Sequence, residues 1–270
     1  MALYDPIDEA DLRRELVRAD RVWTDLLVVE QTGSTNADLV ARARRGARTG
    51  SVLIADYQSA GRGRRGRAWT APPGSSIAMS ALLRPAAGPS RWTWLPLLTG
   101  LAVAEALRRT AGAGAVLKWP NDVLVGGRKL CGILAERVDT EEGPACVIGI
   151  GINVWLTAAE LPVPTATSLA LLADVVPEVH VPSRKELIAA TLDRLEEAYR
   201  SWESSADQSS LRAAYLARCD TIGRAVRVVL ADRELDGVAE SIDADGRLMV
   251  RTSSGTEVIG AGDVIHLRRV

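Results

Sequence analysis

Apolar and polar positions follow two different rhythms along this chain. Up to about residue 218, apolar residues recur at helical spacing or in short runs bounded by glycine, proline and polar residues. This pattern is typical of helices packed against a buried sheet. It predicts helices at about 8–19, 35–45, 92–109, 168–174, 183–203 and 208–217, and strands at 26–30, 52–56, 77–83, 123–125, 130–135 and 145–155.

The pattern changes at about Thr221, where short alternating strands replace the helices. Asp245-Gly246 and Ser254-Gly255 supply turns between them. Five strands in about 50 residues suggest a small barrel of SH3-like size. We therefore predict an α+β protein with a mixed central sheet flanked by helices in residues 1–218, and a C-terminal SH3-like β-barrel in residues 219–270. The strands of that barrel are expected at 225–230, 235–242, 247–252, 257–259 and 263–267.

Composition limits the classes of partner. A chain of 270 residues with 47% hydrophobic content can bury a sizeable core, and its net charge of −1 gives no bulk attraction to nucleic acid or membrane. Its three cysteines form no CxxC pair, which favours free thiols in a reducing compartment over zinc or disulfides. No secretory signal or apolar run of roughly 18 residues is present, so we expect a cytoplasmic protein.

The stretch YQSAGRGRRGRAWT at 57–70 concentrates glycine and arginine in one loop. Glycine lets a ligand approach the backbone closely, and arginine forks bind phosphate or carboxylate oxygens in pairs. The stretch therefore predicts an anion cradle rather than a solvated basic turn. Because like charges repel, we expect the empty loop to be mobile and to become ordered when an anion neutralises it. Its glycines are Gly61, Gly63 and Gly66, and its arginines are Arg62, Arg64, Arg65 and Arg67.

The same loop fits the dinucleotide fingerprint GxGxxG, but its surroundings exclude that interpretation. A strand precedes the loop, as the fingerprint requires. However, Pro72-Pro73 forbids a helix directly after it, and no acidic residue occurs between Asp56 and Glu105 to hold a ribose. The loop therefore does not belong to a Rossmann fold.

Residues 116–138 form a second informative stretch. Gly126-Gly127 signals a hairpin, which would bring Lys118 and Lys129 near one another on adjacent strands. Pro120 breaks the first apolar run and leaves Asn121 and Asp122 at a corner, which is either a buried polar corner or part of a site. Only three lysines occur in the chain, and two lie here.

Three other features remain ambiguous from the residues alone. Ser34, Thr35 and Asn36 open a helix, with Thr35 and Asp38 at capping-box spacing, and capping alone is the simpler interpretation. Alternating glycines at 149 and 151 imply that another backbone or a ligand comes close, and Asn153 in the same apolar run needs a partner. His180 and His266 stand apart from any carboxylate cluster, so both are interpreted as structural.

Taken together, five motifs in order resemble the biotin–protein ligase family over nearly the whole chain. They are GSTN at 33–36, Q-x-x-GRGRRGR-x-W at 58–69, KWPND at 118–122, KLCGIL at 129–134 and GIGINV at 149–154. The resemblance implies the fold shared with class II aminoacyl-tRNA synthetases. It also implies a two-step reaction, in which biotin and ATP, supplied with Mg²⁺, form biotinyl-5′-AMP, and a lysine of a biotin carboxyl carrier domain then takes the biotin. No tightly bound cofactor is implied.

The resemblance also implies roles for individual residues. Lys129, Arg64 and Arg62 would act on the reacting carboxyl and α-phosphate groups, and Asp122 is the candidate Mg²⁺ ligand, directly or through water. The biotin pocket would be formed by Ser34, Thr35, Asn36, Gln58, Gly61, Arg62, Gly63, Arg64, Lys129 and Gly132. For Ser34, Thr35 and Asn36 this role replaces the interpretation that they only cap a helix. The nucleotide would contact Arg62, Arg64, Arg67, Trp69, Lys118, Asn121 and Asn153.

Two alternatives stay open at this point: a lipoate–protein ligase with the same adenylating chemistry, and a non-catalytic biotin-binding module. The GRGRRGR loop and the KWPND motif favour a biotin ligase over a lipoate ligase. The presence of both motif lysines and of every loop arginine favours an enzyme over a non-catalytic binding module. The pocket motif already begins at Gly33, which argues against a DNA-binding domain. The resemblance implies biotin carboxyl carrier domains as partners. A homodimer formed through the sheet edge is open, and Cys131 stands where the family often has alanine.

Overall fold

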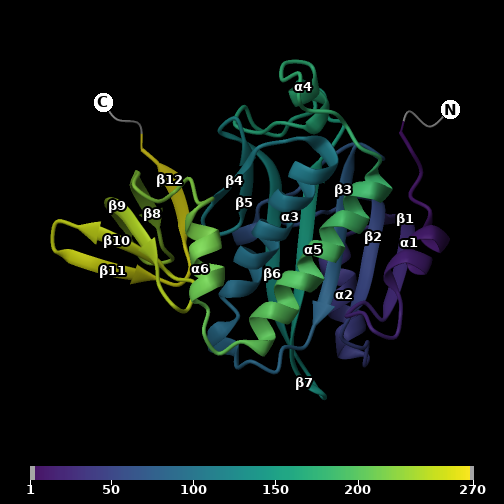
Figure 1. Ribbon diagram of the computed structural model, residues 1–270, viewed down its shortest axis with the longest axis horizontal. Coiled ribbons are helices and arrows are strands. Elements are labelled where there is room, and N and C mark those ends of the chain that lie inside the picture. Colours follow the sequence, from purple (N-terminus) through teal and green to yellow (C-terminus); the bar gives the residue numbers. More distant parts are fainter. Residues whose placement is uncertain (1–3, 268–270) are drawn as a thin grey trace.

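The computed structural model of the protein describes residues 4–267, which form a large sheet with helices on both faces and a smaller sheet beside it (Figure 1). The helices are α1 Glu9–Leu16, α2 Thr35–Arg44, α3 Trp94–Ala111, α4 Leu169–Ala173, α5 Arg184–Ser204 and α6 Ser209–Leu216. The strands are β1 Asp25–Thr32, β2 Ser51–Gln58, β3 Ser76–Leu83, β4 Ala115–Lys118, β5 Asp122–Val125, β6 Arg128–Thr140, β7 Gly143–Asn153, β8 Ala225–Val229, β9 Glu234–Ile242, β10 Leu248–Thr252, β11 Gly255–Ile259 and β12 Asp263–His266.

The large sheet has seven strands in the order β1-β2-β3-β7-β6-β5-β4. Only β1 and β2 are parallel, so the sheet is mixed, as predicted. Helices α3 and α5 pack on one face and bury the larger apolar core, whereas α2 covers part of the other face through Leu39 and Ala43 (Figure 1). Strand β3 is buried along its whole length because both faces are covered.

The hairpin at Gly126-Gly127 forms as predicted, with positive φ at both glycines, and it joins β5 to β6. The predicted placement of the two lysines on adjacent strands is wrong. Lys118 ends β4 and Lys129 is the second residue of β6, and β5 lies between these two strands. The corner at Pro120 reverses the chain and adds a strand that the hairpin signal alone did not reveal.

Two helix boundaries also differ from the predictions. Helix α1 ends at Leu16, so Ala19 lies outside it. The N-cap of α2 is Ser34 rather than Thr35, and its side chain accepts a hydrogen bond from the Ala37 amide. Thr35 therefore keeps its side chain free for other partners, which matters for the site.

The five C-terminal strands form one antiparallel sheet in the order β11-β10-β9-β8-β12. It is joined to the large sheet by backbone pairing of Leu117 with residues 218–220. The indole N–H groups of Trp94 and Trp119 also donate to the carbonyls of Ala244 and Gly246. These contacts fix the smaller sheet beside β4, and the boundary between residues 218 and 219 stays a prediction.

No helix within residues 4–267 is long and apolar enough to cross a membrane.

Candidate active site

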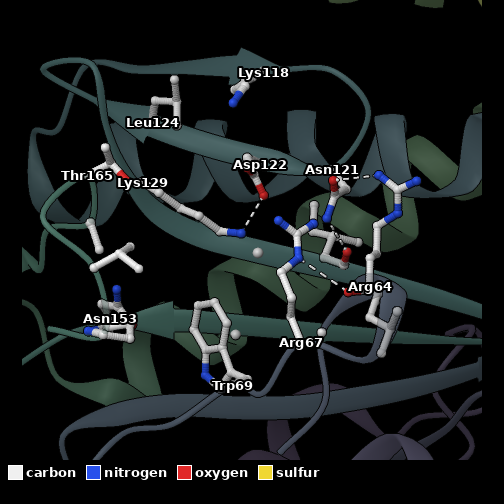
Figure 2. Close-up of a pocket in the computed structure, with 18 of the residues that line it drawn as sticks. Arg64, Arg67, Trp69, Lys118, Asn121, Asp122, Leu124, Lys129, Asn153 and Thr165 are labelled. Atoms are coloured by element: carbon white, nitrogen blue, oxygen red, sulfur yellow. Dashed lines mark hydrogen bonds and ion pairs between the residues drawn. The ribbon is translucent and has the colours of Figure 1, made fainter. Parts of the chain in front are cut away.

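A cavity of about 1230 Å³ lies between the large sheet, the 57–70 loop and the C-terminal sheet (Figure 2). It brings together almost all of the residues singled out from the sequence. These are Ser34, Thr35, Asn36, Gln58, Arg62, Gly63, Arg64, Arg67, Trp69, Lys118, Asn121, Asp122, Lys129, Gly132 and Asn153. The motifs thus converge on one cavity although they are spread over about 120 residues of sequence.

Gly61 is placed differently from the prediction, because it does not line this cavity. A Cβ atom there would lie 2.3 Å from the Trp69 carbonyl oxygen and 2.9 Å from Gln58 Nε2. The Gly61 carbonyl accepts a hydrogen bond from the Trp69 amide. Gly61 therefore lets the two sides of the loop pack together behind the cavity wall.

One end of the cavity is built from buried hydroxyl and amide groups. The Gln58 Oε1 atom accepts from both the amide and the hydroxyl of Thr35, at 2.8 and 3.0 Å. Ser80 Oγ, on β3, lies 2.8 Å from Thr35 Oγ1 and 2.6 Å from Asn36 Oδ1. Ser34, Thr35, Asn36 and Ser80 are each less than 5% exposed. Their hydrogen bonds hold these side chains in fixed orientations.

The same network continues into the 57–70 loop through Glu136 of β6. Asn36 Nδ2 donates to Glu136 Oε2 at 2.8 Å and to the Leu134 carbonyl at 3.1 Å. The other oxygen of Glu136 lies 3.3 Å from the Arg62 guanidinium. Glu136 therefore connects the polar end of the cavity to the first arginine of the loop.

Three glycines make room for the side chains that shape the cavity. A Cβ atom at Gly149 would lie 2.2 Å from Asn36 Oδ1, and one at Gly151 would lie 2.5 Å from the Trp69 ring. At Gly132, a Cβ atom would meet both Trp69 and Lys129 at 3.0 to 3.2 Å. The alternating glycines of β7 therefore admit two side chains of the site, rather than the backbone or ligand that the sequence implied.

Lys129 reaches into the centre of the cavity, where its ammonium lies 2.6 Å from Asp122 Oδ1 (Figure 2). Lys118 faces Asp122 across the β4–β5 pair. Burial lowers the pKa of Lys118, and Lys129 acts in the same direction, while Asp122 opposes both. The Lys129 ammonium also lies 5.8 Å from the centre of the Trp69 ring. A positively charged group is thus held at a fixed place between a carboxylate and an aromatic wall.

Two asparagines stabilise the neighbouring backbone. Asn121 Nδ2 donates to the Ile133 carbonyl, and Asn121 Oδ1 accepts from Arg64 at 3.1 Å. Asn153 Nδ2 donates to the Thr167 carbonyl at 2.9 Å, which supplies the partner that its buried position required. Both side chains also face the cavity.

The arginines of the 57–70 loop have partners within the protein. Arg64, Arg65 and Arg67 all point to one carboxylate, Asp263 at the start of β12, with N–O distances of 3.5, 3.9 and 2.9 Å. Burial lowers the pKa of Arg64, which is the most enclosed of the three. We expected the empty loop to be mobile because its arginines repel each other. That expectation did not include Asp263, which supplies a negative charge from within the protein.

Several residues in or next to the cavity were missed or misassigned from the sequence, and of these only His266 lines it. Ser80, Glu136 and Asp263 carried no motif signal, and their contacts come from strand pairing and from the packing of the two sheets. His266 was interpreted as structural, yet it lines the cavity and its Nε2 lies 3.1 Å from Thr221 Oγ1. Burial and the nearby cations Lys118 and Arg224 lower its pKa to about 4. His180 is exposed and lies away from the cavity.

Within residues 4–267, no group of three or more His, Cys, Asp or Glu side chains could hold a metal ion. The three cysteines are free and buried, and burial raises the pKa of Cys131, Cys146 and Cys219. Cys131 lies beside the cavity residues without lining it. These thiols are therefore unsuited to act as nucleophiles or metal ligands.

Comparison with known proteins agrees with this geometry. Residues 28–153 match the "Biotin/lipoate A/B protein ligase family", and residues 221–267 match the "Biotin protein ligase C terminal domain". A biotin--[acetyl-CoA-carboxylase] ligase of Mycobacterium tuberculosis is 44% identical over 98% of both chains. The bifunctional ligase/repressor BirA of Escherichia coli is 33% identical over 92% of this chain and 75% of its own length. The solved structure of the Aquifex aeolicus biotin protein ligase with biotin and ATP has a TM-score of 0.77 and 27% identity, covering 92% of this chain and all of that one.

Proposed function

The chain belongs to the biotin protein ligase family, and from this premise we propose that it attaches biotin to a lysine of biotin carboxyl carrier domains through biotinyl-5′-AMP made from ATP. The observation that carries the proposal is the division of one cavity into a buried polar end and a cationic centre. The names of the Mycobacterium tuberculosis and Aquifex aeolicus relatives, which mention an acetyl-CoA carboxylase, biotin and ATP, support it.

The polar end favours biotin over lipoate. Biotin carries a ureido ring with two N–H donors and one carbonyl, whereas the dithiolane ring of lipoate offers no N–H or carbonyl. Gln58, Thr35 and Ser34 present fixed amide and hydroxyl groups at this end. A ligand that left such groups unpaired in a closed pocket would bind poorly. We propose that Ser34, Thr35, Asn36 and Gln58 bind the ureido ring, with Gly63 and Gly132 beside it.

The cationic centre suits the chemistry of the carboxyl group. When the biotin carboxylate attacks the α-phosphate of ATP, the new acyl–phosphate bond replaces the bond to the β-phosphate and pyrophosphate leaves. The carboxylate and the phosphate are both negatively charged and repel each other as they approach. Lys129, held by Asp122, would bring its ammonium to both groups and stabilise the transferring charge. Arg62 and Arg64 would hold the carboxyl and phosphate oxygens from the loop side. In the second step the same groups would stabilise charge on the departing AMP.

The remaining cavity would receive the nucleotide. Arg67 would contact the phosphates, and Lys118, Asn121 and Asn153 would give polar contacts to the adenylate. Trp69 packs on Gly132 and Gly151, so its ring would form a wall between the biotin and adenylate parts of the cavity.

Asp122 fits a metal ion that arrives with the nucleotide. It is a single carboxylate in the cavity, and Mg²⁺ commonly combines one or two carboxylates with phosphate oxygens and water. We propose that Asp122 contacts Mg²⁺ directly or through water. The ion would neutralise charge on the ATP phosphates, while Asp122 also fixes the Lys129 ammonium.

Partners and compartment follow from the same proposal. Carrier domains of biotin-dependent carboxylases are the proposed acceptors. Residues 4–24 contain one helix, α1, which packs on β1 and α5, so we propose no DNA-binding role for this segment. Three buried free thiols suit a reducing, cytoplasmic setting. A homodimer through the β1 edge of the sheet stays a proposal.

A transfer assay tests the proposal. The protein is incubated with biotin, Mg-ATP and a carboxyl carrier domain, and the carrier is examined by mass spectrometry. We expect the carrier to gain one biotin less one water, and a carrier with arginine at the acceptor lysine to stay unmodified. Tight biotin binding with no transfer and no ATP consumption would instead support a non-catalytic binding module.

A further inference from the structure

Four arginines gather where α2 ends and the chain leads into β2. They are Arg42, Arg44, Arg45 and Arg48, and no acidic residue occurs in the stretch 39–55 around them. Arg44, Arg45 and Arg48 are exposed, and Arg42 is half-buried. We call these four residues the arginine patch. It concentrates positive charge on a protein whose net charge is only −1.

The arginine patch has no partner within the described chain. In residues 4–267, no carboxylate lies within ion-pair distance of its guanidinium groups, and these groups make no hydrogen bond. Of the other described arginines, only Arg18 and Arg128 share this property. Glu142 comes beside the patch, since a Cβ atom at Gly46 would lie 3.6 Å from its Oε1, but Glu142 pairs with Arg84 at 3.0 Å. Unpaired arginines of the described chain are therefore concentrated at one place.

The dipole of α2 accounts for only part of the arginine patch. Cations are favourable near the C-terminus of a helix, and Arg42 and Arg44 lie in the last turn of α2. Arg45 is already the C-cap residue, and Arg48 lies in the connection to β2. Like charges this close repel each other, so gathering all four does not stabilise the fold. A role in binding explains the patch better than a role in folding.

The backbone that carries the patch has a fixed conformation. The Ala47 amide donates to the Arg42 carbonyl at 3.0 Å, and Gly46, with φ of +84°, closes the end of the helix. From β3, the Arg84 guanidinium donates to the Ala47 carbonyl at 3.3 Å. The patch thus presents its charges from defined backbone positions.

Helix α2 connects the arginine patch to the cavity. Its first residues, Thr35 and Asn36, lie at the polar end of the cavity, and its last residue is Arg44 (Figure 1). Ten helical residues span about 15 Å. A domain of about 100 residues has a radius of gyration of about 13 Å. A carrier domain whose lysine enters the cavity therefore covers surface out to about the distance of the patch.

We propose that the arginine patch is a docking surface for the carrier domain, and that it binds an acidic face of that domain during biotin transfer. This rests on the proposed function. Guanidinium groups bind carboxylates in pairs, and a local positive surface speeds and orients the encounter with an acidic partner. The patch acts in the transfer step alone, because adenylation needs biotin and ATP but no carrier.

The test compares both half-reactions in charge-reversal variants. Arg44→Glu and Arg45→Glu each remove one positive charge and add one negative charge, which takes the net charge from −1 to −3. At low salt, kcat/KM for the carrier domain should fall about threefold in each variant and about tenfold in the double variant, the lower end of the range for electrostatic steering. Pyrophosphate release without a carrier should stay within about twofold of the parent, because neither arginine lines the cavity.

Arg18→Glu is the matched control. It makes the same change of charge at another exposed arginine without a partner in residues 4–267. We expect kcat/KM for the carrier to stay within about twofold of the parent in this control, because Arg18 lies outside the patch.

Salt and a neutral substitution separate charge effects from misfolding. Salt screens exposed charges, so the parent and the double variant should differ by less than about twofold at about 0.5 M NaCl. Arg44→Gln combined with Arg45→Gln places no acid at the helix C-terminus. It should keep the parental melting temperature and still lose about threefold in kcat/KM for the carrier at low salt.

Several results would overturn the proposal. They are an unchanged kcat/KM for the carrier in the double variant, an equal loss in Arg18→Glu, a loss that persists at high salt, or a parallel fall in pyrophosphate release. Duplex DNA that binds the parent but not the double variant, with unchanged carrier kinetics, would assign the patch to nucleic acid instead. If the parent transfers no biotin, the proposed function fails and carrier docking fails with it, whereas unchanged variants beside an active parent reject the docking surface alone.

Discussion

Gly149→Ala is the smallest change that tests how the polar end of the cavity is built. The added methyl group would lie 2.2 Å from Asn36 Oδ1 and 2.9 Å from Asn36 Cγ. Contacts this short force one partner to move. Gly149 lies in the middle of β7 and pairs with both β3 and β6, so the Asn36 side chain is the group that must yield.

The magnitude follows from the bonds that Asn36 would lose. Its side chain is 4% exposed and binds Ser80, the Leu134 carbonyl and Glu136 at 2.6, 3.1 and 2.8 Å. Breaking two of these bonds would cost about 2 kcal/mol, at about 1 kcal/mol each. For a chain of this size that lowers the melting temperature by about 4–8 °C. Because Ser80 also contacts Thr35, we expect the KM for biotin to rise about tenfold while the KM for ATP changes little.

The assay combines thermal unfolding with biotin and ATP titrations of pyrophosphate release. Gly114→Ala is the control, because a Cβ atom there meets nothing within 4 Å and the residue is exposed. That control should match the parent or be slightly more stable, since alanine restricts the unfolded chain. Parental stability and biotin KM in Gly149→Ala would show that Asn36 does not organise this end of the cavity.

Other substitutions address the centre of the cavity, the loop and pH dependence. Asp122→Asn removes the partner of the Lys129 ammonium, and kcat for pyrophosphate release should fall by at least about tenfold; an unchanged kcat would contradict the role given to this pair. Arg64→Ala removes a bond to Asn121 and the contact with Asp263, so free biotinyl-5′-AMP should escape faster and label bystander proteins; equal escape from mutant and parent would refute this. His266 has a pKa near 4 in the folded protein against 6.5 when free, so the unfolded chain binds more protons between these values and stability should fall as pH drops from 6.5 to 4. Lys118, Arg224, Asp220 and Thr221 surround this ring, and His266→Gln should flatten that part of the pH profile of the melting temperature, whereas an identical profile would count against it.

The central residues of the site could be predicted because each motif combines glycines, which allow a tight turn or a close approach, with charged or polar side chains. Gly126-Gly127 predicts the hairpin between β5 and β6, and in the structure this hairpin brings Asp122 and Lys129 together. The alternating glycines at 149 and 151 predict a close approach, although the approaching groups are side chains. In both cases the signal lies within a few residues of sequence.

The supporting contacts could not be predicted, because they depend on long-range packing. Glu136 meets Asn36 across a hundred residues of sequence, and it does so only because α2 packs over β6 and β7. Asp263 meets Arg67 only because the C-terminal sheet docks beside β4. The wrong placement of Lys118 also came from a contact that the sequence does not reveal. The chain turns at Pro120, and only the pairing of β4 with β5 shows that Lys118 lies on a separate strand.

The central claim is that this cavity activates biotin with ATP, and pyrophosphate release without any carrier tests it most directly. The protein is supplied with Mg-ATP and either biotin or lipoate, beside a Lys129→Ala control. We predict release with biotin, little or none with lipoate, and loss of release in Lys129→Ala. Release with lipoate and not biotin would contradict the assignment of the polar end, and no release with either would contradict adenylation itself.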